Sequence, residues 1–302
     1  MKAVVQYKYG GTDKLFLEEV SKPTIKDNQI LIEVHAANIA SGDMRINTID
    51  VPMLLKPIFR LIFGFTGPRK KVRGLTGSGK IVEIGKKVTK YKKGDRVNYI
   101  NSMNAGCLAE FLVLKEKSVM AKIADNVSYI DSAPIAFGAM SAFHFINEDT
   151  VKKGYKVLIY GASGSVGSYA LQLAKYYGAE VTAVCSKKNH EVMKSIGADN
   201  VIDYKTEDFT NSSVRYDVVF DSVSKVSKKQ CKAVLNDNGV FMSVRTLTKE
   251  MSSRVELLNG LLSENKISTL IDQVFKLEEY KEAHELVYGK HKVGNVVIEL
   301  KK

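Results

Sequence analysis

The sequence is poor in cysteine and has no long uninterrupted apolar run. Its three cysteines, Cys107, Cys185 and Cys231, lie far apart and form no Cys-x-x-Cys pair. This spacing excludes a disulfide framework and indicates small buried residues of a reducing compartment. The most apolar stretch, Val51–Phe65, is broken by prolines and basic residues and is too short to cross a bilayer, so we expect no transmembrane segment. Met1–Gly10 lacks the apolar region of a signal peptide, and we expect a cytoplasmic protein.

The charge balance is one-sided, but the excess is dispersed. The 302 residues, enough for two domains, include 45 basic and 33 acidic residues, for a formal net charge of +12. Much of the excess consists of scattered lysine pairs such as Lys86–Lys87 and Lys187–Lys188, which are typical of solvated turns. No nucleic-acid recognition motif accompanies the charge, so we expect no nucleic acid as the main partner.

The first third of the chain has the pattern of β structure. Short apolar or alternating runs occur at Met1–Tyr7, Ile30–Ala37, Ile81–Ile84 and Glu110–Leu114, with turn signals between them. Several short strands of this kind predict a small barrel-like domain. The apolar and basic segment Ile49–Arg73 is different, and three interpretations stay open: a lid or wall of an apolar pocket, a helix on a membrane surface, or a short helix packed on the barrel.

From about residue 132 the pattern changes to alternating helices and strands. After an apolar helix candidate at Ser132–Phe145, the predicted strands are Val157–Tyr160, Val181–Cys185, Val201–Asp203, Asp217–Asp221 and Val240–Val244. The later predicted helices are Val226–Leu235, Ser253–Asn265 and Leu277–Tyr288, followed by a last strand at Asn295–Leu300. Alternating strands and helices predict a parallel sheet with right-handed crossovers, so the expected fold class is α/β.

One segment carries most of the functional information. In Tyr155–Gly178 the apolar run Val157–Tyr160 ends at a glycine-rich turn, and a helix with one apolar face follows at once. A strand, a tight glycine turn and a helix form the unit that holds the pyrophosphate of a dinucleotide. Small residues let the backbone approach the phosphates, and the first helical N–H groups point at them. The segment therefore predicts a bound dinucleotide.

The end of the second strand of this unit bears on which dinucleotide is bound. NAD-selective sites place an acidic residue there to hold the 2′-hydroxyl. Here the strand ends at Cys185 and Ser186, and Lys187 and Lys188 follow. Because an acid would repel a 2′-phosphate and a lysine attracts it, these residues favour NADPH over NADH.

Longer segments resemble the medium-chain dehydrogenase/reductase superfamily, most closely its zinc-free quinone oxidoreductase (zeta-crystallin-like) branch. The resemblance covers nearly the whole chain, and its strongest pieces are Gly77–Val97, Cys107–Leu114, Gly161–Lys175 and Ser195–Phe209. It implies a GroES-like β-barrel domain, residues 1–121 and 265–302, plus an inserted Rossmann domain with a doubly wound parallel sheet, residues 122–264. Relatives are often dimers, which makes a homodimer an implication of the resemblance only.

The resemblance also bears on metal binding. Zinc enzymes of the superfamily carry a catalytic cysteine, a Gly-His-Glu segment and usually a lobe of four cysteines. In this chain the cysteine position falls on Ala40 and the His-Glu position on Leu75–Thr76. Neither Ala nor Leu can ligate zinc, and the five histidines show no ligand-like spacing. We therefore expect no zinc, and chemistry that is supplied by the cofactor in an apolar cleft.

The resemblance implies particular cofactor contacts. The glycine turn matches the family's Ala-x-Gly-x-x-Gly form, a Ser, a Lys and a Tyr clasp the adenosine phosphate, and another Ser falls where the family has a Thr near the nicotinamide. The implied cofactor residues are Ser141, Ala162, Ser163, Gly164, Ser165, Val166, Gly167, Ser186, Lys187 and Tyr204. The chain departs from the family at Ser224–Lys225, where glycines are usual, and in a shorter segment after Val244.

Without a metal to polarise a hydroxyl, hydride donation to an electrophilic π system is easier than alcohol oxidation. We therefore expect a zinc-independent, NADPH-dependent reductase that transfers hydride to a small lipophilic quinone or α,β-unsaturated carbonyl. Candidate catalytic residues near the family's substrate-side loop are Asn38, Ser41 and Arg45, and we expect Asp43 to hold that loop together. The alternative is an NADPH-binding protein whose main role is contact with RNA or a membrane surface.

Overall fold

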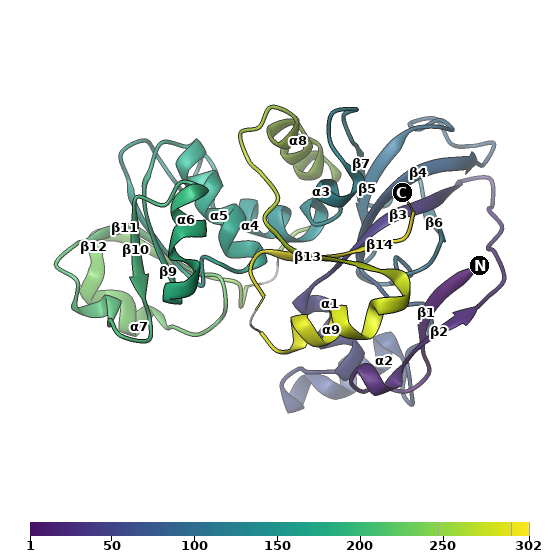
Figure 1. Ribbon diagram of the computed structural model, residues 1–302, viewed down its shortest axis with the longest axis horizontal. Helices are drawn as coiled ribbons and strands as arrows, with labels where there is room; N and C mark the ends of the chain where they lie inside the picture. Colours follow the sequence, from purple (N-terminus) through teal and green to yellow (C-terminus); the bar gives the residue numbers. More distant parts are fainter. Residues whose placement is uncertain (247, 291, 302) are drawn as a thin grey trace. The chain divides into compact units, whose positions relative to one another are not determined.

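The computed structural model describes residues 1–246, 248–290 and 292–301 (Figure 1). The chain divides into two compact units. The first comprises Met1–Phe137, Val255–Asn259 and Ile271–Lys302, and the second comprises Gly138–Arg254 and Gly260–Leu270. These units are defined by their internal contacts. The domain boundaries predicted after residues 121 and 264 remain predictions.

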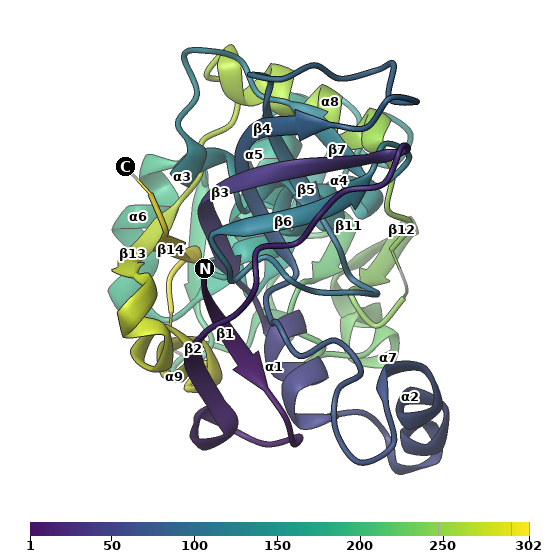
Figure 2. The same cartoon turned by 90° about the vertical axis from the view of Figure 1, so that its right-hand side faces the viewer.

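The first unit is built on a seven-stranded sheet that curves around its own core (Figure 2). Its strands are β3 (Gln29–Ile39), β4 (Thr76–Ile84), β5 (Arg96–Ile100), β6 (Phe111–Lys115), β7 (Met120–Lys122), β13 (Ile271–Lys276) and β14 (Asn295–Glu299). The order is β13-β14-β3-β4-β5-β7 with β6 also on β3, and every pair except β13–β14 is antiparallel. A separate antiparallel pair joins β1 (Lys2–Gln6) to β2 (Leu15–Glu19).

Strand β3 is the centre of this unit because its side chains are buried over most of its length, and it pairs with β4, β6 and β14. Apolar residues of β3, β4 and β5 share one core, which includes Ile30, Ile32, Ile81, Val97 and Tyr99. The helices of the unit are α1 (Ser41–Thr48), α2 (Lys56–Phe63), α3 (Tyr129–Ser132) and α9 (Tyr280–Tyr288), with 3₁₀ turns η1 (Thr12–Lys14), η2 (Met53–Leu55) and η7 (Leu277–Glu279).

The second unit contains a five-stranded sheet in which every pair is parallel. Its strands are β8 (Lys156–Tyr160), β9 (Glu180–Cys185), β10 (Asn200–Asp203), β11 (Tyr216–Asp221) and β12 (Leu235–Ser243), in the order β10-β9-β8-β11-β12. The order reverses between β8 and β11, and ligands of such sheets bind at the carboxyl ends of the strands at this switch point. The predicted α/β class, with a GroES-like antiparallel sheet and a Rossmann-type parallel sheet, is confirmed.

The helices of the second unit are short apart from one. They are α4 (Met140–Phe145), α5 (Ser165–Tyr176), α6 (His190–Ser195) and α7 (Lys228–Cys231), with 3₁₀ turns η4 (Lys187–Asn189), η5 (Phe209–Asn211) and η6 (Lys232–Val234). Helix α8 (Ser252–Ser263) contributes residues to both units. Helix α5 is buried continuously from Gly167 to Ala174, because it packs against the sheet and also against α4.

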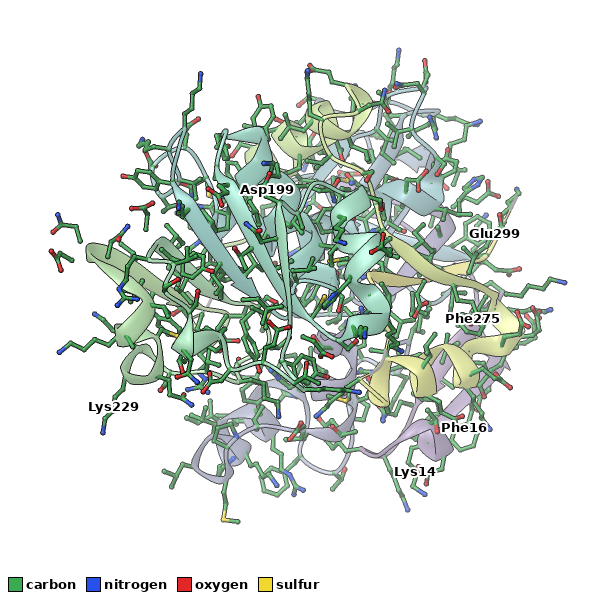
Figure 3. All side chains as sticks on the ribbon, turned by 60° about the vertical axis from the view of Figure 1, so that its left-hand side comes forward. Lys14, Phe16, Asp199, Lys229, Phe275 and Glu299 are labelled. Atoms are coloured by element: carbon green, nitrogen blue, oxygen red, sulfur yellow. The ribbon has the colours of Figure 1, made fainter. Side chains whose placement is uncertain are left out.

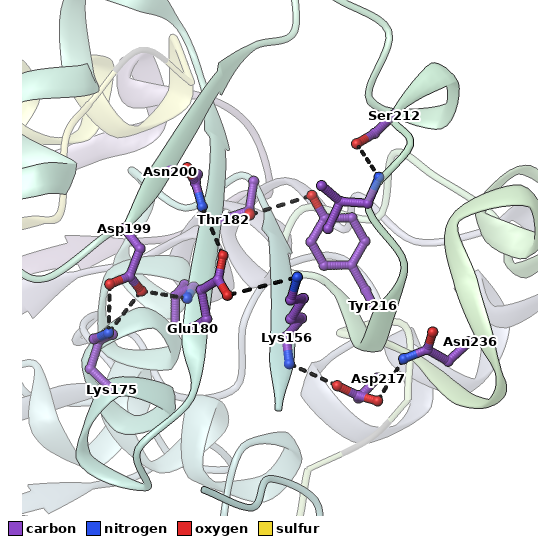
Figure 4. Close-up of polar contacts among 12 residues, drawn as sticks. Lys156, Lys175, Glu180, Thr182, Asp199, Asn200, Ser212, Tyr216, Asp217 and Asn236 are labelled. Atoms are coloured by element: carbon purple, nitrogen blue, oxygen red, sulfur yellow. Dashed lines mark hydrogen bonds and ion pairs between the residues drawn. The ribbon is translucent and has the colours of Figure 1, made fainter. Parts of the chain in front are cut away.

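Polar contacts fasten the amino ends of the parallel strands (Figure 4). The backbone N–H of Lys156 donates to Asp217 Oδ2 at 2.7 Å, and Asn236 donates to Asp217 Oδ1 at 2.7 Å, which links β8, β11 and β12. Asp199 accepts hydrogen bonds from Lys175 at 2.7 Å and from the Val181 N–H at 2.7 Å. These contacts use the amino edge of the sheet and leave the carboxyl edge to ligands.

Two predicted helices differ from the structure, and strands β2, β5, β7 and β13 were not predicted. The helix expected at Ser132–Phe145 is instead α3, a π-helical turn at Ile135–Ala139 and α4, because Pro134 cannot continue the hydrogen bonding of α3. The helix expected at Val226–Leu235 is shortened to α7 and η6, and β12 begins at Leu235. Strand β13 was not predicted, since Phe275 is its one buried residue and the strand shows no apolar period.

The surface carries the dispersed lysines, and the lysine pairs named above are exposed. Figure 3 shows Lys14 and Lys229 pointing away from the ribbon. No helix within the described part of the chain is long and apolar enough to span a membrane.

A buried amide pair gives the first prediction. Asn98 donates to Asn259 Oδ1 at 2.8 Å and to Ser132 O at 3.0 Å, while Asn259 donates to Asn98 Oδ1 at 2.9 Å and to Lys122 O at 2.8 Å. Both side chains are buried, so Asn98→Leu leaves polar groups unsatisfied and should lower the free energy of unfolding by roughly 2–4 kcal/mol in urea titrations. The double variant with Asn259→Leu should cost less than the sum of the two single changes; additive costs would contradict the pairing.

Candidate active site

The dinucleotide motif of the second unit forms the predicted strand, turn and helix. Gly161 follows β8 with φ +79°, a left-handed conformation that favours glycine, and its N–H donates to Val184 O at 2.9 Å. Gly164 is the N-cap of α5, and its N–H donates to Gly161 O at 3.0 Å. The first turn of α5, which contains Ser165 and Val166, therefore begins at the carboxyl edge of the sheet, and helix N-termini of this kind bind phosphates.

The two later glycines of the motif meet different constraints. A Cβ added to Gly167 would lie 2.3 Å from Gly161 O and 2.8 Å from Ala162 Cα, so only glycine allows α5 to pack this closely on the turn. A Cβ added to Gly164 would have Gly161 O, at 3.5 Å, as its nearest neighbour, so the space beside this residue is open. An open backbone at the second glycine and a crowded third glycine are the features that a pyrophosphate site requires. The residues present thus fit a dinucleotide.

The residues expected at the adenosine end lie at the ends of two paired strands. Cys185 of β9 pairs with Asp203 of β10, so Ser186 and Tyr204 follow directly on neighbouring strands. Lys187 begins η4 and is exposed. Tyr204 is half exposed, and its ring centroid lies 6.5 Å from that of Tyr160. The structure therefore gathers Ser186, Lys187 and Tyr204 at one corner of the sheet.

An open cavity of about 610 Å³ lies beside this corner. Tyr160 and Tyr204 line it, together with the basic residues Lys205 and Lys225 and the acidic residues Glu207 and Asp208. The two lysines were not among the predicted contacts. Their positions in the sequence could have indicated them as ligand contacts. Lys205 follows β10 and Lys225 follows β11, and ligands of parallel sheets bind in the loops after the carboxyl ends of the strands.

The loop after β11 carries the departure from the family glycines. Asp221 is fully buried and accepts hydrogen bonds from the N–H groups of Val223 at 3.1 Å and Val226 at 3.2 Å, which holds the loop. Ser222 donates to Tyr160 O at 2.9 Å and ties the loop to the glycine turn. Ser224 has φ +59°, so this serine occupies a conformation that favours glycine.

Ser141 lies in α4 and is largely buried. One turn earlier, a Cβ added to Gly138 would lie 2.5 Å from Ser165 Oγ, so this part of the chain passes close to the start of α5. Ser141 therefore belongs to the same region of the second unit as the glycine turn.

The candidate catalytic residues belong to the first unit. Asn38 is buried in β3, where its Nδ2 lies 3.5 Å from Thr76 Oγ1, and its Oδ1 has no hydrogen-bond partner among the described residues. A buried amide oxygen without a partner is costly unless a ligand satisfies it. Ser41 and Arg45 are exposed and stand four residues apart on α1, hence on one face of that helix.

Asp43 holds the start of α1. Its Oδ2 accepts a hydrogen bond from the Ala40 N–H at 2.9 Å, which closes a capping interaction. The side chain is buried, and this burial raises the pKa of Asp43 from 3.8 to about 6, opposed by hydrogen bonds from the backbone and by the charge of Arg73. Arg73 is itself buried and donates to Asn47 Oδ1 at 2.8 Å.

The two positions that would carry zinc ligands are apolar and adjacent. Asn38 pairs with Thr76 between β3 and β4, which brings the following Ala40 and the preceding Leu75 to the same end of these strands, and both are buried. Among residues 1–246, 248–290 and 292–301, no three His, Cys, Asp or Glu side chains gather as a metal site would need.

Known protein families match both parts of the fold described above. The chain matches the alcohol dehydrogenase GroES-like domain over residues 26–153 and the zinc-binding dehydrogenase family over residues 165–288. It is 30% identical to the chloroplastic quinone-oxidoreductase homolog of Spinacia oleracea, over 96% of this chain and 95% of that protein. The chain belongs to the medium-chain dehydrogenase/reductase superfamily.

Two further relatives of this superfamily are informative. The chain is 30% identical to the chloroplastic NADPH-dependent alkenal/one oxidoreductase of Arabidopsis thaliana, over 99% of this chain and 79% of that protein. The structure of the quinone oxidoreductase from Coxiella burnetii superposes with a TM-score of 0.84 at 25% identity, over 100% of this chain and 99% of that chain. The protein is thus an oxidoreductase of the superfamily with quinone oxidoreductase-like relatives. Although one matched family is named for zinc, Ala40 and Leu75 offer no ligand atoms here.

The contrast between Gly164 and Gly167 gives the second prediction. Gly164→Ala should fold like the wild type but bind the dinucleotide at least about tenfold more weakly, because the methyl group occupies the space beside the phosphates. Gly167→Ala should also lower thermal stability, because its Cβ would meet the backbone of Gly161. Gly260→Ala, with nothing within 4 Å of the added carbon, serves as the control. Fluorescence titration and thermal melts measure both effects, and unchanged binding in Gly164→Ala would count against the site.

Asp43 gives a prediction about pH. Its pKa is raised in the folded state, so the folded protein binds this proton more tightly than the unfolded chain does. The resulting stability is fully present below the unfolded pKa of 3.8 and is lost as pH rises through the folded value of about 6. The wild type should therefore lose roughly 3 kcal/mol of unfolding free energy relative to Asp43→Asn over this interval. The side chain introduced by Asp43→Asn keeps one acceptor oxygen for the Ala40 N–H, and any change in that hydrogen bond adds an offset that does not depend on pH. A flat difference between the two proteins would therefore contradict the burial effect.

Proposed function

We propose that the protein is a zinc-independent, NADPH-dependent reductase that adds hydride to a quinone or an α,β-unsaturated carbonyl. The proposal rests on two features that occur together in this chain: a dinucleotide-binding turn and the absence of zinc-ligating side chains at two positions. A dinucleotide turn fits its ligand at Gly161–Gly167, while the two positions that would ligate zinc are the apolar residues Ala40 and Leu75. The names of the Spinacia and Arabidopsis relatives support the same acceptor classes.

In this proposal a bound nicotinamide cofactor supplies the hydride, and the protein binds, orients and stabilises charge. The turn and the first N–H groups of α5 hold the pyrophosphate. Lys187, with Ser186 and Tyr204 beside it, holds the 2′-phosphate. The preference for NADPH rests on the absence of an acidic residue at the end of β9 and on these polar and basic groups at the same corner.

The polar groups of the first unit are proposed to serve the acceptor. Negative charge develops on the acceptor oxygen as the electrophilic carbon is reduced, and hydrogen-bond donors aimed at that oxygen lower the barrier. Asn38 can meet it because its Nδ2 makes only the 3.5 Å contact to Thr76 Oγ1. The exposed Ser41 hydroxyl and Arg45 guanidinium are the other donors of the proposal.

A lipophilic acceptor is favoured by a cavity beside α1. This cavity of about 270 Å³ has the apolar residues Ile46, Ile62, Phe63 and Met103 on its walls, and the basic residues Arg69, Lys70 and Arg73 also line it. Ile46 directly follows Arg45 in the chain. We include a cytoplasmic location in the proposal, because Cys107, Cys185 and Cys231 are buried and form no disulfide.

The function is tested by NADPH oxidation with 1,2- and 1,4-quinones and with medium-chain enals and enones. We expect turnover that prefers NADPH to NADH. Lys187→Glu should lower kcat/KM for NADPH by about tenfold or more and leave the NADH reaction unchanged, because a charged hydrogen bond to the 2′-phosphate is lost.

Lys188→Glu is the matched control, since it makes the same charge change at the neighbouring exposed residue. If both variants lose NADPH preference equally, the effect is one of net charge and the clasp at Lys187 is wrong. Tight NADPH binding without turnover on any acceptor would move the interpretation to a cofactor-binding role, and absence of dinucleotide binding would overturn the proposal altogether.

A further inference from the structure

An unusual concentration of exposed apolar side chains lies on η2, α2 and the residue after Gly64. The α2 surface, as we define it, consists of Met53, Leu54, Leu55, Ile58, Leu61, Ile62 and Phe65. Met53 and Leu54 are 82% and 89% exposed, and Leu61 and Phe65 are 68% and 72% exposed. Figures 1 and 2 both show α2 at the lower margin of the first unit. Contiguous exposed apolar groups of this kind mark an interaction site.

The local sequence determines where α2 begins and ends. Pro57 stands in the first turn of α2, and Gly64 with φ +127° ends the helix. Phe59 and Phe63, four residues apart, lie with ring centroids 5.5 Å apart and are half-buried. They are the less exposed side chains of α2.

The side of α2 that carries Ile58 and Leu61 is exposed, and Ile62 beside them also lines the cavity next to α1. Ile58, Leu61 and Ile62 have the spacing i, i+3, i+4 and therefore share one face of the helix. No residue of α2 is fully buried, so the rest of the protein does not surround this helix. Transfer of these apolar side chains from water to an apolar environment would lower the free energy.

Basic side chains predominate around this surface, although the exposed Asp50 lies just before it in the chain. Basic side chains are exposed at Lys56 and Arg60 on α2 and at Arg69, Lys70 and Lys71 after it. The sequence from 51 to 82 contains no Asp or Glu. A partner that fits must therefore be apolar where it meets the α2 surface and negatively charged around it.

We propose that the α2 surface docks the enzyme on an anionic phospholipid membrane. The aliphatic side chains would enter the boundary between headgroups and acyl chains, while the lysines and arginines remain among the headgroups. The absence of any acid from 51 to 82 favours a lipid surface, because a protein partner of mixed charge would gain from opposite charges on this side. The segment is short, so the docking is peripheral and reversible, and it needs both the apolar and the basic groups.

The test is flotation of the full chain with phosphatidylcholine vesicles that contain about one third phosphatidylglycerol, compared with pure phosphatidylcholine vesicles. We expect binding to the anionic vesicles that weakens as salt rises from about 0.1 M to about 0.5 M. Leu61→Glu should lower the partition coefficient at least about tenfold, and Arg60→Gln should lower it about fivefold.

The matched control is Leu257→Glu, at a leucine of α8 that is 45% exposed and outside the α2 surface. It should bind vesicles like the wild type, and thermal melts should show that all variants fold. Equal losses in Leu61→Glu and Leu257→Glu, or no binding to anionic vesicles, would overturn the proposal. So would a wild-type dimer that Leu61→Glu converts to monomer, because a second copy would then cover this surface. None of these readouts requires turnover, so they are independent of the proposed reductase activity.

Discussion

The close approach of α5 to the glycine turn is the constraint on which the second unit depends. There is no room for a side chain at Gly167, because a Cβ would lie 2.3 Å from Gly161 O. This contact places the start of α5 at the carboxyl edge of the parallel sheet, at the point where the strand order reverses. Ser222 then ties the loop after β11 to the same turn. The position of the helix N-terminus, and with it the proposed phosphate site, follows from one contact that only glycine permits.

In the first unit, buried polar groups gather where β3 leads into α1. Asp43 caps α1 and lies near the buried Arg73, and Asn38 stands at the end of β3 that leads into this helix. Burying such groups is unfavourable unless hydrogen bonds or charges offset it, and the raised pKa of Asp43 shows that the offset is incomplete. Asn38 Oδ1 is a buried acceptor without a partner among the described residues, so only a hydrogen-bond donor can satisfy it.

Membership of the superfamily and the chemistry of individual residues complement each other. The superfamily defines an oxidoreductase, and Ala40 and Leu75 distinguish this chain from its zinc-dependent members, since neither can ligate a metal. Under the proposed function, the work of stabilising an oxyanion passes to hydrogen-bond donors of the first unit. The α2 surface is a feature that the proposed reaction does not require, and we propose for it a separate role in membrane docking.

Local sequence patterns were enough to predict much of the secondary structure and the fold class of this protein. Glycine spacing after an apolar run predicted β8, the turn and α5, and alternating strands and helices predicted the parallel sheet, because these features depend on neighbours within a few residues. The strand order, the edge strand β13 and the Asn98–Asn259 pair depend on residues far apart in the chain, so sequence patterns could not reveal them. For Ile49–Arg73 the sequence left three roles open. Only the tertiary structure decided that α2 keeps Phe59 and Phe63 half-buried and leaves Leu61 in water, because burial depends on what the rest of the fold places beside a helix.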